Sequence, residues 1–346
     1  MIAIHHRESS FSECWIEYCQ KHDIPFKVVN AYADDIIKQL ADCDGVMWHW
    51  HQNEYRDQLF ARQLVFALES AGKKVFPNSN TSWHFDDKIG QKYLLEAHNL
   101  PLVPTHCFFD CESAMKWLDN SNFPKVFKLR NGAGSKNVQL VKNRVQAEKI
   151  LKTAFGRGFG SRTRKSILDE AFWRFKRDKD IINLLRIFKT LMLIASHPAT
   201  KSKLQVQKNY LYFQDFIPNN QYDDRLVVIG DRCFCMRRYC RSDDFRASGS
   251  GVFSYEIDQF PKESIKIAFT VAKKIRSQSC AMDFVYSDDG MPMIVEISYC
   301  FTPGRVYEDC HGYFDSELNW HDLPVRPEEF ILEDFLFDIA ESTTIK

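Results

Sequence analysis

The sequence predicts an α/β protein in which a short parallel sheet precedes a larger region of helices and antiparallel strands. Strand-like and helix-like segments alternate over residues 1–80, which is typical of parallel strands joined by crossover helices. Further along, apolar strands separated by tight turns indicate antiparallel pairing. The chain has 346 residues, of which 45% are hydrophobic, so it can form two or three structural lobes around a sizeable core.

The N-terminal region reads as strand, helix, strand, helix, strand, helix and strand. Ser10 precedes an amphipathic stretch and is expected to cap the first helix, while Gly72 is expected to end the third helix. The expected strands are 2–5, 26–30, 45–50 and a strand beginning at 74–76, and the expected helices are 10–22, 34–40 and 59–71.

The middle of the chain predicts a helix at 84–99, followed by strand, helix, strand, glycine loop, strand and helix over 105–155. Residues 156–206 read as a basic helical insertion that packs its apolar face on the core. The alternative is a basic amphipathic helix on a membrane surface or a partner. Later strands are expected at 210–216, 224–229 and 232–239, a helix at 262–277, a hairpin at 280–286 and 293–298, and a last helix near 327–339.

Composition excludes several classes of protein. Lys plus Arg equals Asp plus Glu at 46 each, which argues against bulk attraction to nucleic acid or membranes. The 11 cysteines are odd in number and scattered, so reduced thiols in a cytoplasmic protein are expected. Neither a secretory segment nor an apolar run of about 18 residues is present in the sequence, and no transmembrane helix is expected.

A glycine loop follows an apolar strand that ends near Lys128. The small residues at 131–135 would let backbone N–H groups approach an anion, although a plain hairpin turn is the alternative. The loop lacks the Gly-Lys-Ser/Thr of a P-loop, and a strand follows it, which excludes a dinucleotide fingerprint. The run at 214–218 combines an apolar strand with a polar bend that can read an adenine ring, or it is an ordinary strand end.

Two carboxylates are expected to lie opposite each other in the hairpin. Pairing about the turn at 288–290 places Asp283 opposite approximately Glu296, so that the two side chains share a face. Like charges in an apolar sheet repel each other unless a cation joins them, and hard oxygen ligands suit Mg²⁺. Solvent-facing acids on an edge strand are the alternative.

A group of arginines falls within 22 residues, with aspartates interspersed as in a built polar site: Arg225, Arg237, Arg238, Arg241 and Arg246. The guanidinium fork matches carboxylate and phosphate groups and can neutralise a transferring phosphoryl group. Alternation along a strand sends Arg237 and Arg238 to opposite faces, so at most one of them points into a given site. A solvated basic face is the alternative.

Two histidines, His49 and His51, are expected on one face of a strand. Two histidines are an incomplete ligand set for a metal. We therefore favour structural packing or packing against a substrate over a metal site.

Taken in order, these motifs resemble the ATP-grasp superfamily, most closely the branch that holds glutathione synthetases and the enzymes that ligate glutamate to protein tails. The resemblance covers about 78–300. It implies an ATP-grasp fold in which a pre-ATP-grasp α/β domain at 1–80 precedes a small lobe at 81–142 and a large lobe at 143–340. The small lobe would carry the glycine loop, and the large lobe the adenine hinge, the arginines, the metal site and the insertion.

The resemblance also implies roles for individual residues. Asp87-Lys88 resembles the family's first phosphate lysine, Lys128 the second, and 214–217 the adenine hinge. The stretch 224–230 resembles the Asp-Ile-Arg strand, Arg237-Arg238 and 244–248 resemble the arginine-bearing strand and loop, and Asp283 with 296–298 resembles the metal motif. The implied ATP-binding residues are Lys88, Lys128, Gly132, Gly134, Ser135, Gln214, Asp215, Phe216, Ile217 and Asp223; the implied catalytic residues are Arg225, Arg237 and Arg246; and the implied ligands of one or two Mg²⁺ ions are Asp283, Glu296 and Ser298.

The function implied is an ATP-dependent ligase that joins a carboxylate to an amine through an acylphosphate, releasing ADP and phosphate. Partners would be ATP, a small-molecule, peptide or sugar carboxylate and an amine, with no nucleic acid, and a homodimer is compatible with the resemblance. Ser298 and Ser248 stand where the family has asparagine, and the insertion lengthens the segment before the hinge. A small-molecule kinase on the same fold, or a nucleotide-binding protein without turnover, are the alternatives.

Overall fold

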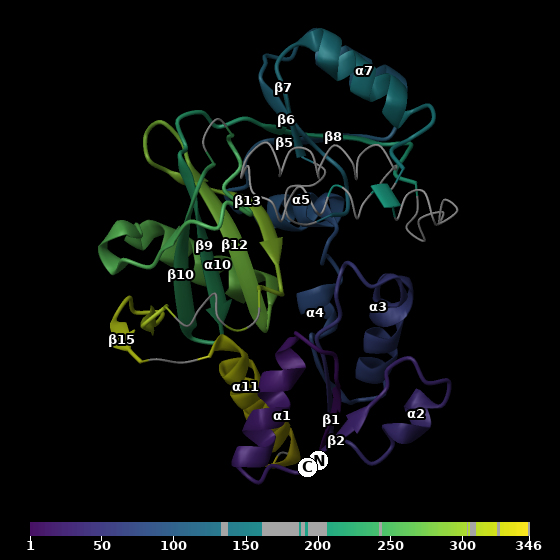
Figure 1. The fold of residues 1–346 in the computed structure, drawn as a ribbon, viewed down its shortest axis with the longest axis vertical. Coiled ribbons are helices and arrows are strands. Elements are labelled where there is room, and N and C mark those ends of the chain that lie inside the picture. Colours follow the sequence, from purple (N-terminus) through teal and green to yellow (C-terminus); the bar gives the residue numbers. More distant parts are fainter. Residues whose placement is uncertain are drawn as a thin grey trace. The chain divides into compact units, whose positions relative to one another are not determined.

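The computed structural model describes residues 1–132, 138–160, 187, 191–192, 206–241, 244–302, 304, 309–323 and 326–344. These residues form two compact units. The first comprises Met1–Thr105, Lys125–Leu140 and Phe213–Lys346, and the second comprises His106–Pro124 and Val141–Tyr212 (Figure 1). Gly134, Ser135 and most of the insertion at 156–206 lie outside the described residues, and the three domain ranges expected from the sequence remain a prediction.

The first unit begins with a sheet of four parallel strands in the order β2-β1-β3-β4, as the alternating pattern predicts. Ser10 caps the first helix by accepting the N–H of Ser12 at 3.3 Å. The third helix starts four residues earlier than expected, since Glu54 caps it by accepting the N–H of Arg56. The elements are β1 (Ile2–His5), α1 (Phe11–Lys21), β2 (Phe26–Val29), α2 (Ile36–Gln39), β3 (Gly45–Trp48), α3 (Tyr55–Ser70), β4 (Lys74–Phe76), α4 (Ser79–Ser82) and α5 (Lys88–Ala97).

A second sheet of seven strands dominates the rest of the first unit. Its order is β13-β12-β9-β10-β14-β15, and β11 pairs with β10. The strands are β9 (Tyr222–Ile229), β10 (Arg232–Tyr239), β11 (Phe253–Ser254), β12 (Ser279–Tyr286), β13 (Pro292–Ser298), β14 (Gly312–Phe314) and β15 (Trp320–Asp322), accompanied by the 3₁₀ turn η1 (Ile257–Gln259) and by α10 (Lys262–Ile275) and α11 (Pro327–Thr344).

The two faces of this sheet have different roles. Apolar residues such as Leu226 and Met282 form one core cluster with the buried side of α10. Because successive side chains alternate across a strand, residues 223, 225 and 283 point to the opposite face. That opposite face is therefore the one that can carry polar chemistry.

Helix α11 lies beside α1, as Figure 1 shows. The indole Nε1 of Trp15 donates to the carbonyl of Glu328 at 3.0 Å, and the Tyr18 hydroxyl donates to Glu333 at 2.8 Å. Both are contacts between residues more than 300 positions apart in the sequence. The C-terminal helix is thus part of the same core as the N-terminal sheet.

A third sheet has the order β5-β8-β6-β7. Within the first unit, β6 pairs antiparallel with β8, so that Lys125 lies opposite Asp215 and Phe127 opposite Phe213. Within the second unit, Arg144 forms an ion pair with Asp119. The strands are β5 (Thr105–Phe108), β6 (Lys125–Lys128), β7 (Val138–Val141) and β8 (Leu211–Asp215), and the second unit's helices that lie wholly in the described ranges are α6 (Cys111–Asp119) and α7 (Arg144–Ala154).

All 11 cysteines are free thiols, as expected from their count and scatter. In the described part of the chain, no helix has the length and apolar character needed to cross a membrane.

Candidate active site

The first unit contains a cavity of about 920 Å³. Its floor is the polar face of the large sheet, and residues of β6, β8, the segments after β1 and β3, and the loop at 245–249 complete it. Ligand pockets usually enclose 300–1,000 Å³, so this cavity lies near the upper end of that range. It has room for a nucleotide together with part of a second reactant.

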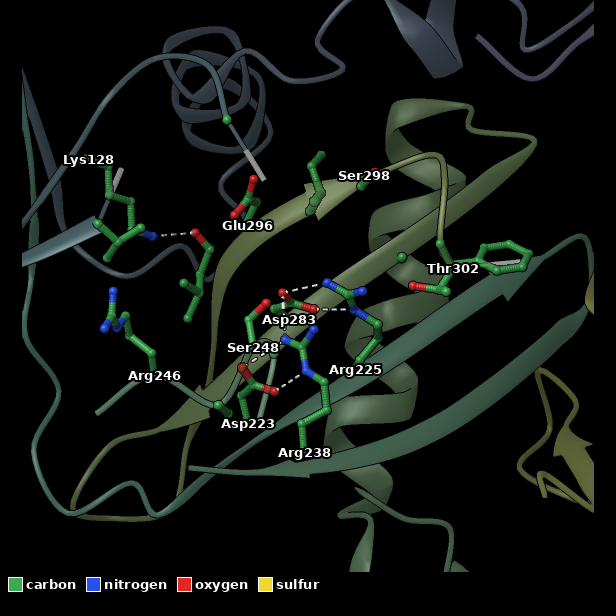
Figure 2. Close-up of a pocket in the computed structure, with 18 of the residues that line it drawn as sticks. Lys128, Asp223, Arg225, Arg238, Arg246, Ser248, Asp283, Glu296, Ser298 and Thr302 are labelled. Atoms are coloured by element: carbon green, nitrogen blue, oxygen red, sulfur yellow. Dashed lines mark hydrogen bonds and ion pairs between the residues drawn. The ribbon is translucent and has the colours of Figure 1, made fainter. Parts of the chain in front are cut away.

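The two hairpin acids lie opposite each other, as predicted from the turn. Asp283 pairs with Glu296 in the register of β12 and β13, and Asp283 also lies opposite Arg225 of β9. Directly opposed residues of antiparallel strands share a face, so all three side chains point into the cavity. Figure 2 shows Asp283 between two arginines, with Glu296 on the neighbouring strand.

Asp283 is held by two guanidinium groups. Arg225 donates from Nε at 2.7 Å and from Nη2 at 2.9 Å, and Arg238 lies 2.7 Å from Oδ2. Burial alone would raise the pKa of Asp283, but the two arginines outweigh it and hold the pKa well below its usual range. Asp283 is therefore an anion in the folded protein at any ordinary pH.

Arg238, and not Arg237, belongs to the cavity. Arg237 lies on the α10 face, where it pairs with the buried carboxylate of Asp224 at 2.7 Å and stacks on Tyr222. The expectation that Arg237 is in the site was wrong because the two-residue turn after β9 pairs residues 225 with 236 and 223 with 238. Residue 238 therefore shares the face of Arg225, and residue 237 does not.

A β-bulge shapes the end of the cavity near Lys128. The register shifts after Asp283, so that Phe284 pairs with Ile294 and Val295 has no opposite residue. The Val295 carbonyl accepts from Gln214 at 3.3 Å and lies 3.5 Å from Lys128 Nζ. Lys128 also donates to Gln214 Oε1 at 2.6 Å, and burial lowers the pKa of this lysine to about 8.

Strand β8 and the residues that follow it also line the cavity near Lys128. Asp215, Phe216 and Ile217 all line the cavity with Gln214. Asp215 forms an ion pair with Lys125 at 2.6 Å. The ring of Phe216 meets the ring of Phe245 edge-on, with the two ring centroids 5.8 Å apart. The predicted hinge residues are therefore gathered at one end of the cavity.

Lys88 lies behind the cavity wall rather than on it. Its ammonium contacts Glu296 at 3.0 Å and donates to the Gly132 carbonyl at 2.9 Å. Burial opposes the charge on Lys88, but Glu296 and Asp86 raise its pKa above the usual value. Gly132 itself lines the cavity.

Asp86 is a lining residue that sequence reasoning missed. It accepts the N–H of Gly132 at 2.7 Å, and burial raises its pKa to about 6. A second acid immediately before Asp87-Lys88, at the start of a helix, was the available signal.

The remaining predicted residues are each bound to a neighbour. Asp223 lines the cavity and pairs with Arg238, and Arg246 also lines it and pairs with Asp244 at 2.6 Å. The Ser298 hydroxyl donates to the Cys300 carbonyl at 2.8 Å and accepts the Cys300 N–H at 3.2 Å. Ser298 therefore stabilises the turn after β13.

The donor set suits a single hard cation better than two. Asp283 and Glu296 present carboxylate oxygens on one face, which is the ligand type that Mg²⁺ prefers. Among the described residues, no group of three or more His, Cys, Asp or Glu side chains could hold a metal by itself. A metal here would need phosphate oxygens or water to complete its coordination.

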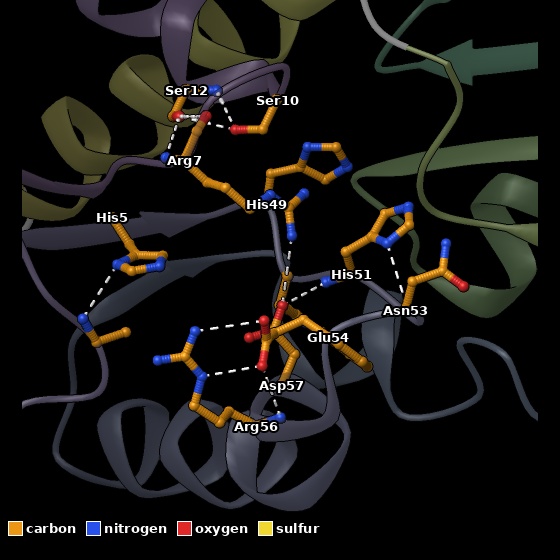
Figure 3. Close-up of polar contacts among 12 residues, drawn as sticks. His5, Arg7, Ser10, Ser12, His49, His51, Asn53, Glu54, Arg56 and Asp57 are labelled. Atoms are coloured by element: carbon orange, nitrogen blue, oxygen red, sulfur yellow. Dashed lines mark hydrogen bonds and ion pairs between the residues drawn. The ribbon is translucent and has the colours of Figure 1, made fainter. Parts of the chain in front are cut away.

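The histidine segment also lines the cavity. Arg7, which follows β1, and His49 and His51, which follow β3, all line it. Figure 3 shows these side chains around Asp57, to which Arg7 and the N–H of His51 are joined. The sequence favoured two roles for these histidines, structural packing and packing against a substrate, and their position in the cavity lining is compatible with both.

A family model described as the RimK-like ATP-grasp domain matches residues 187–301. No curated protein matches the chain. Among solved structures, D-alanine–D-alanine ligase from Bacillus anthracis complexed with ATP has a TM-score of 0.58 at 15% identity, covering 99% of this chain and 97% of that one.

Two other solved structures extend the comparison. D-cycloserine synthetase DcsG has a TM-score of 0.57 at 14% identity, covering 96% of this chain and 99% of that chain. The ATP-grasp ligase PsnB complexed with minimal precursor, Mg and ADP has a TM-score of 0.54 at 12% identity, covering 98% of each. At these identities the matches show the fold, which extends over nearly the whole chain.

Proposed function

Because this chain belongs to the ATP-grasp superfamily, we propose that it is an ATP-dependent ligase that joins a carboxylate to an amine. The observation that carries the proposal is the cavity face on which Asp283 and Glu296 oppose each other beside Arg225, with Lys128 at one end. A face with two paired carboxylates and several positively charged side chains suits a polyphosphate that carries a bound metal ion. D-Alanine–D-alanine ligase and the ATP-grasp ligase PsnB, which share the fold, are ligases by name.

In the proposed complex, ATP lies with its adenine against 214–217 and its phosphates toward Lys128 and Glu296. Lys128 now contacts Gln214, a neutral partner, so its ammonium can turn to a phosphate without leaving a buried carboxylate unpaired. Lys88 holds Glu296 and the Gly132 carbonyl, which fixes the start of the glycine loop. Gly134 and Ser135 remain predicted phosphate contacts outside the described residues.

Asp283 and Glu296 are the residues that would hold magnesium. When bound, the ion supplies neutralisation of charge at the phosphate oxygens. Both acids now bind cationic side chains, so each would have to release part of its contact with Arg225 and Arg238 or with Lys88 to hold the ion. Ser298 is left out of this ligand set because its two hydrogen bonds to the Cys300 backbone form the turn after β13.

The proposed chemistry has two steps. A substrate carboxylate oxygen forms a bond to the γ-phosphorus while the bond to ADP breaks, which gives an acylphosphate. The amine nitrogen then bonds to the acyl carbon, phosphate leaves, and the nitrogen loses a proton. Arg225, Arg238 and Arg246 face the cavity and would stabilise charge that develops on the phosphoryl oxygens.

The test is a screen of carboxylate and amine pairs for ADP release, with mass spectrometry of the product. We expect an amide product, and loss of turnover in Lys128→Ala and Glu296→Gln. Lys116→Ala, at an exposed lysine of α6, is the matched control and should retain activity. ADP release that neither site variant reduces would contradict the proposal, and a stable phosphorylated product without an amine requirement would identify a kinase instead.

A further inference from the structure

Four residues form a distinct wall of the cavity, which we call the N-terminal wall: Arg7, His49, His51 and Gln52. They follow β1 and β3, which are adjacent parallel strands. The carboxyl ends of such strands meet at one edge of the sheet, where open α/β sheets bind ligands. The ATP-binding residues proposed above come from other elements, so this wall is unassigned.

His49 presents a hydrogen-bond donor that nothing satisfies. Its Nδ1 accepts the N–H of Phe11 at 3.1 Å, and its ring stacks on the Phe11 ring with centroids 3.8 Å apart. A neutral imidazole that accepts at Nδ1 carries its proton on Nε2. In the described part of the chain, that Nε2 is buried and has no hydrogen-bond partner.

The neutral state of His49 follows from its surroundings. The residue is 3% exposed, and burial together with the charge of Arg7 keeps its pKa well below the usual value. A buried donor left without a partner costs about 1–3 kcal/mol. His49 lines the cavity, and an acceptor atom of a ligand that reached this buried N–H would recover that energy.

His51 and Gln52 add to the pattern. His51 accepts the N–H of Asn53 at Nδ1, at 3.2 Å, so it too carries its ring proton on Nε2. Burial and Arg7 lower the pKa of His51 to about 4. Among described atoms, Gln52 Oε1 is a buried acceptor without a partner, so the wall offers two neutral donors, one acceptor and one guanidinium.

A buried aspartate positions these groups. Asp57 is fully buried and accepts the N–H of His51 at 2.7 Å and the hydroxyl of Tyr32 at 2.6 Å. Arg7 lies 3.6 Å from the same carboxylate, at the limit of an ion pair. Asp57 therefore fixes the histidine segment while Arg7 retains donors for another anion.

We propose that the N-terminal wall is the subsite for a carboxylate group of an amino-acid or peptide substrate, a proposal that rests on the ligase function above. Arg7 would bind the carboxylate, the Nε2–H groups would donate to it, and Gln52 would accept from the neighbouring N–H. A planar monoanion matches one guanidinium fork. A phosphate dianion would lie near the carboxylates of Glu54 and Asp57, and only Arg7 could turn to it, because Arg56 is already bound to Glu54.

The test uses the 20 standard amino acids and their primary amides as probes, by calorimetry on the full chain with magnesium and a non-hydrolysable ATP analogue. At least one amino acid should bind roughly tenfold or more tightly than its amide, which corresponds to about 1.4 kcal/mol. Arg7→Gln should abolish that preference and leave binding of the ATP analogue unchanged. Arg56→Gln, at a neighbouring exposed arginine that pairs with Glu54, is the matched control and should keep the preference.

Two further readouts keep the test decisive. Gln52→Leu, at a half-buried loop position, should weaken binding of the amino acid more than binding of an α-hydroxy acid of the same shape, because only the amino acid offers an N–H. In histidine-selective NMR, the His49 Nε2 proton should shift when the probe binds.

Absence of a carboxylate preference in every probe, an unchanged preference in Arg7→Gln, or tighter binding of inorganic phosphate than of the carboxylates would overturn the subsite. Failure of the ATP analogue to bind would instead overturn the proposed function.

Discussion

Replacing Asp283 by asparagine tests whether the arginine pair at the cavity floor is a structural unit. Asp283 has a side chain that is 13% exposed, and its carboxylate receives Arg225 at 2.7 and 2.9 Å and Arg238 at 2.7 Å. Asparagine keeps the size and one acceptor oxygen but removes the charge. Two largely buried guanidinium groups would then lack part of their counter-charge.

The size of the effect follows from the burial. Removing one partner of a buried ion pair costs about 3–5 kcal/mol, and the remaining amide oxygen and Asp223 favour the lower end. In a unit of this size, about 1 kcal/mol changes Tm by roughly 2 °C. The expected result for Asp283→Asn is therefore a fall in Tm of roughly 6 °C in the protein without ligand.

The assay is thermal unfolding followed by circular dichroism, with Asp258→Asn as the control at an exposed aspartate of η1. The control should change Tm by about 1 °C or less, as surface substitutions usually do. If Asp283→Asn were as stable as the control, the carboxylate would not be holding the arginines and the electrostatic account of the cavity floor would be wrong.

Three further predictions concern other parts of the site. Burial lowers the pKa of Lys128 to about 8, so this lysine loses its charge as the pH rises through that value. Calorimetry should therefore find that ATP binds more weakly at pH 9 than at pH 7, by up to about tenfold, and that Lys128→Met removes the difference. Ser298→Ala should leave the magnesium concentration for half-maximal ATP binding within about twofold, because its hydroxyl serves Cys300; a large increase would restore Ser298 as a ligand. Arg237→Gln should lower Tm by several degrees, because the buried carboxylate of Asp224 loses its arginine partner, while ATP affinity stays unchanged. A loss of ATP affinity without a fall in Tm would place Arg237 in the site.

Much of the floor of the site was predictable from the sequence. The parallel N-terminal sheet followed from alternation, and the pairing of Asp283 with Glu296 followed from the position of a turn. Both depend on local pattern, namely hydrophobic period and turn chemistry, which the sequence carries directly. The choice of Arg238 over Arg237 was also within reach, since the same counting across the turn after β9 gives it.

Other features depend on contacts between distant segments. The Val295 carbonyl reaches Lys128 and Gln214 because a β-bulge leaves Val295 without an opposite residue in the pairing of β12 and β13. Such bulges have no reliable signal in the sequence. The tautomer of His49 is set by the N–H of Phe11, 38 positions away. Asp86 gains its raised pKa from burial that only the folded chain provides.

The central claim is that Asp283 and Glu296 form, with Lys128, a site for magnesium-bound ATP. The most direct measurement is the ATP dissociation constant, by calorimetry, with and without Mg²⁺ in the natural protein and in Glu296→Gln. Mg²⁺ should tighten ATP binding at least about tenfold in the natural protein and much less in the variant. Equal effects of Mg²⁺ in both proteins, or no ATP binding in either, would contradict the claim.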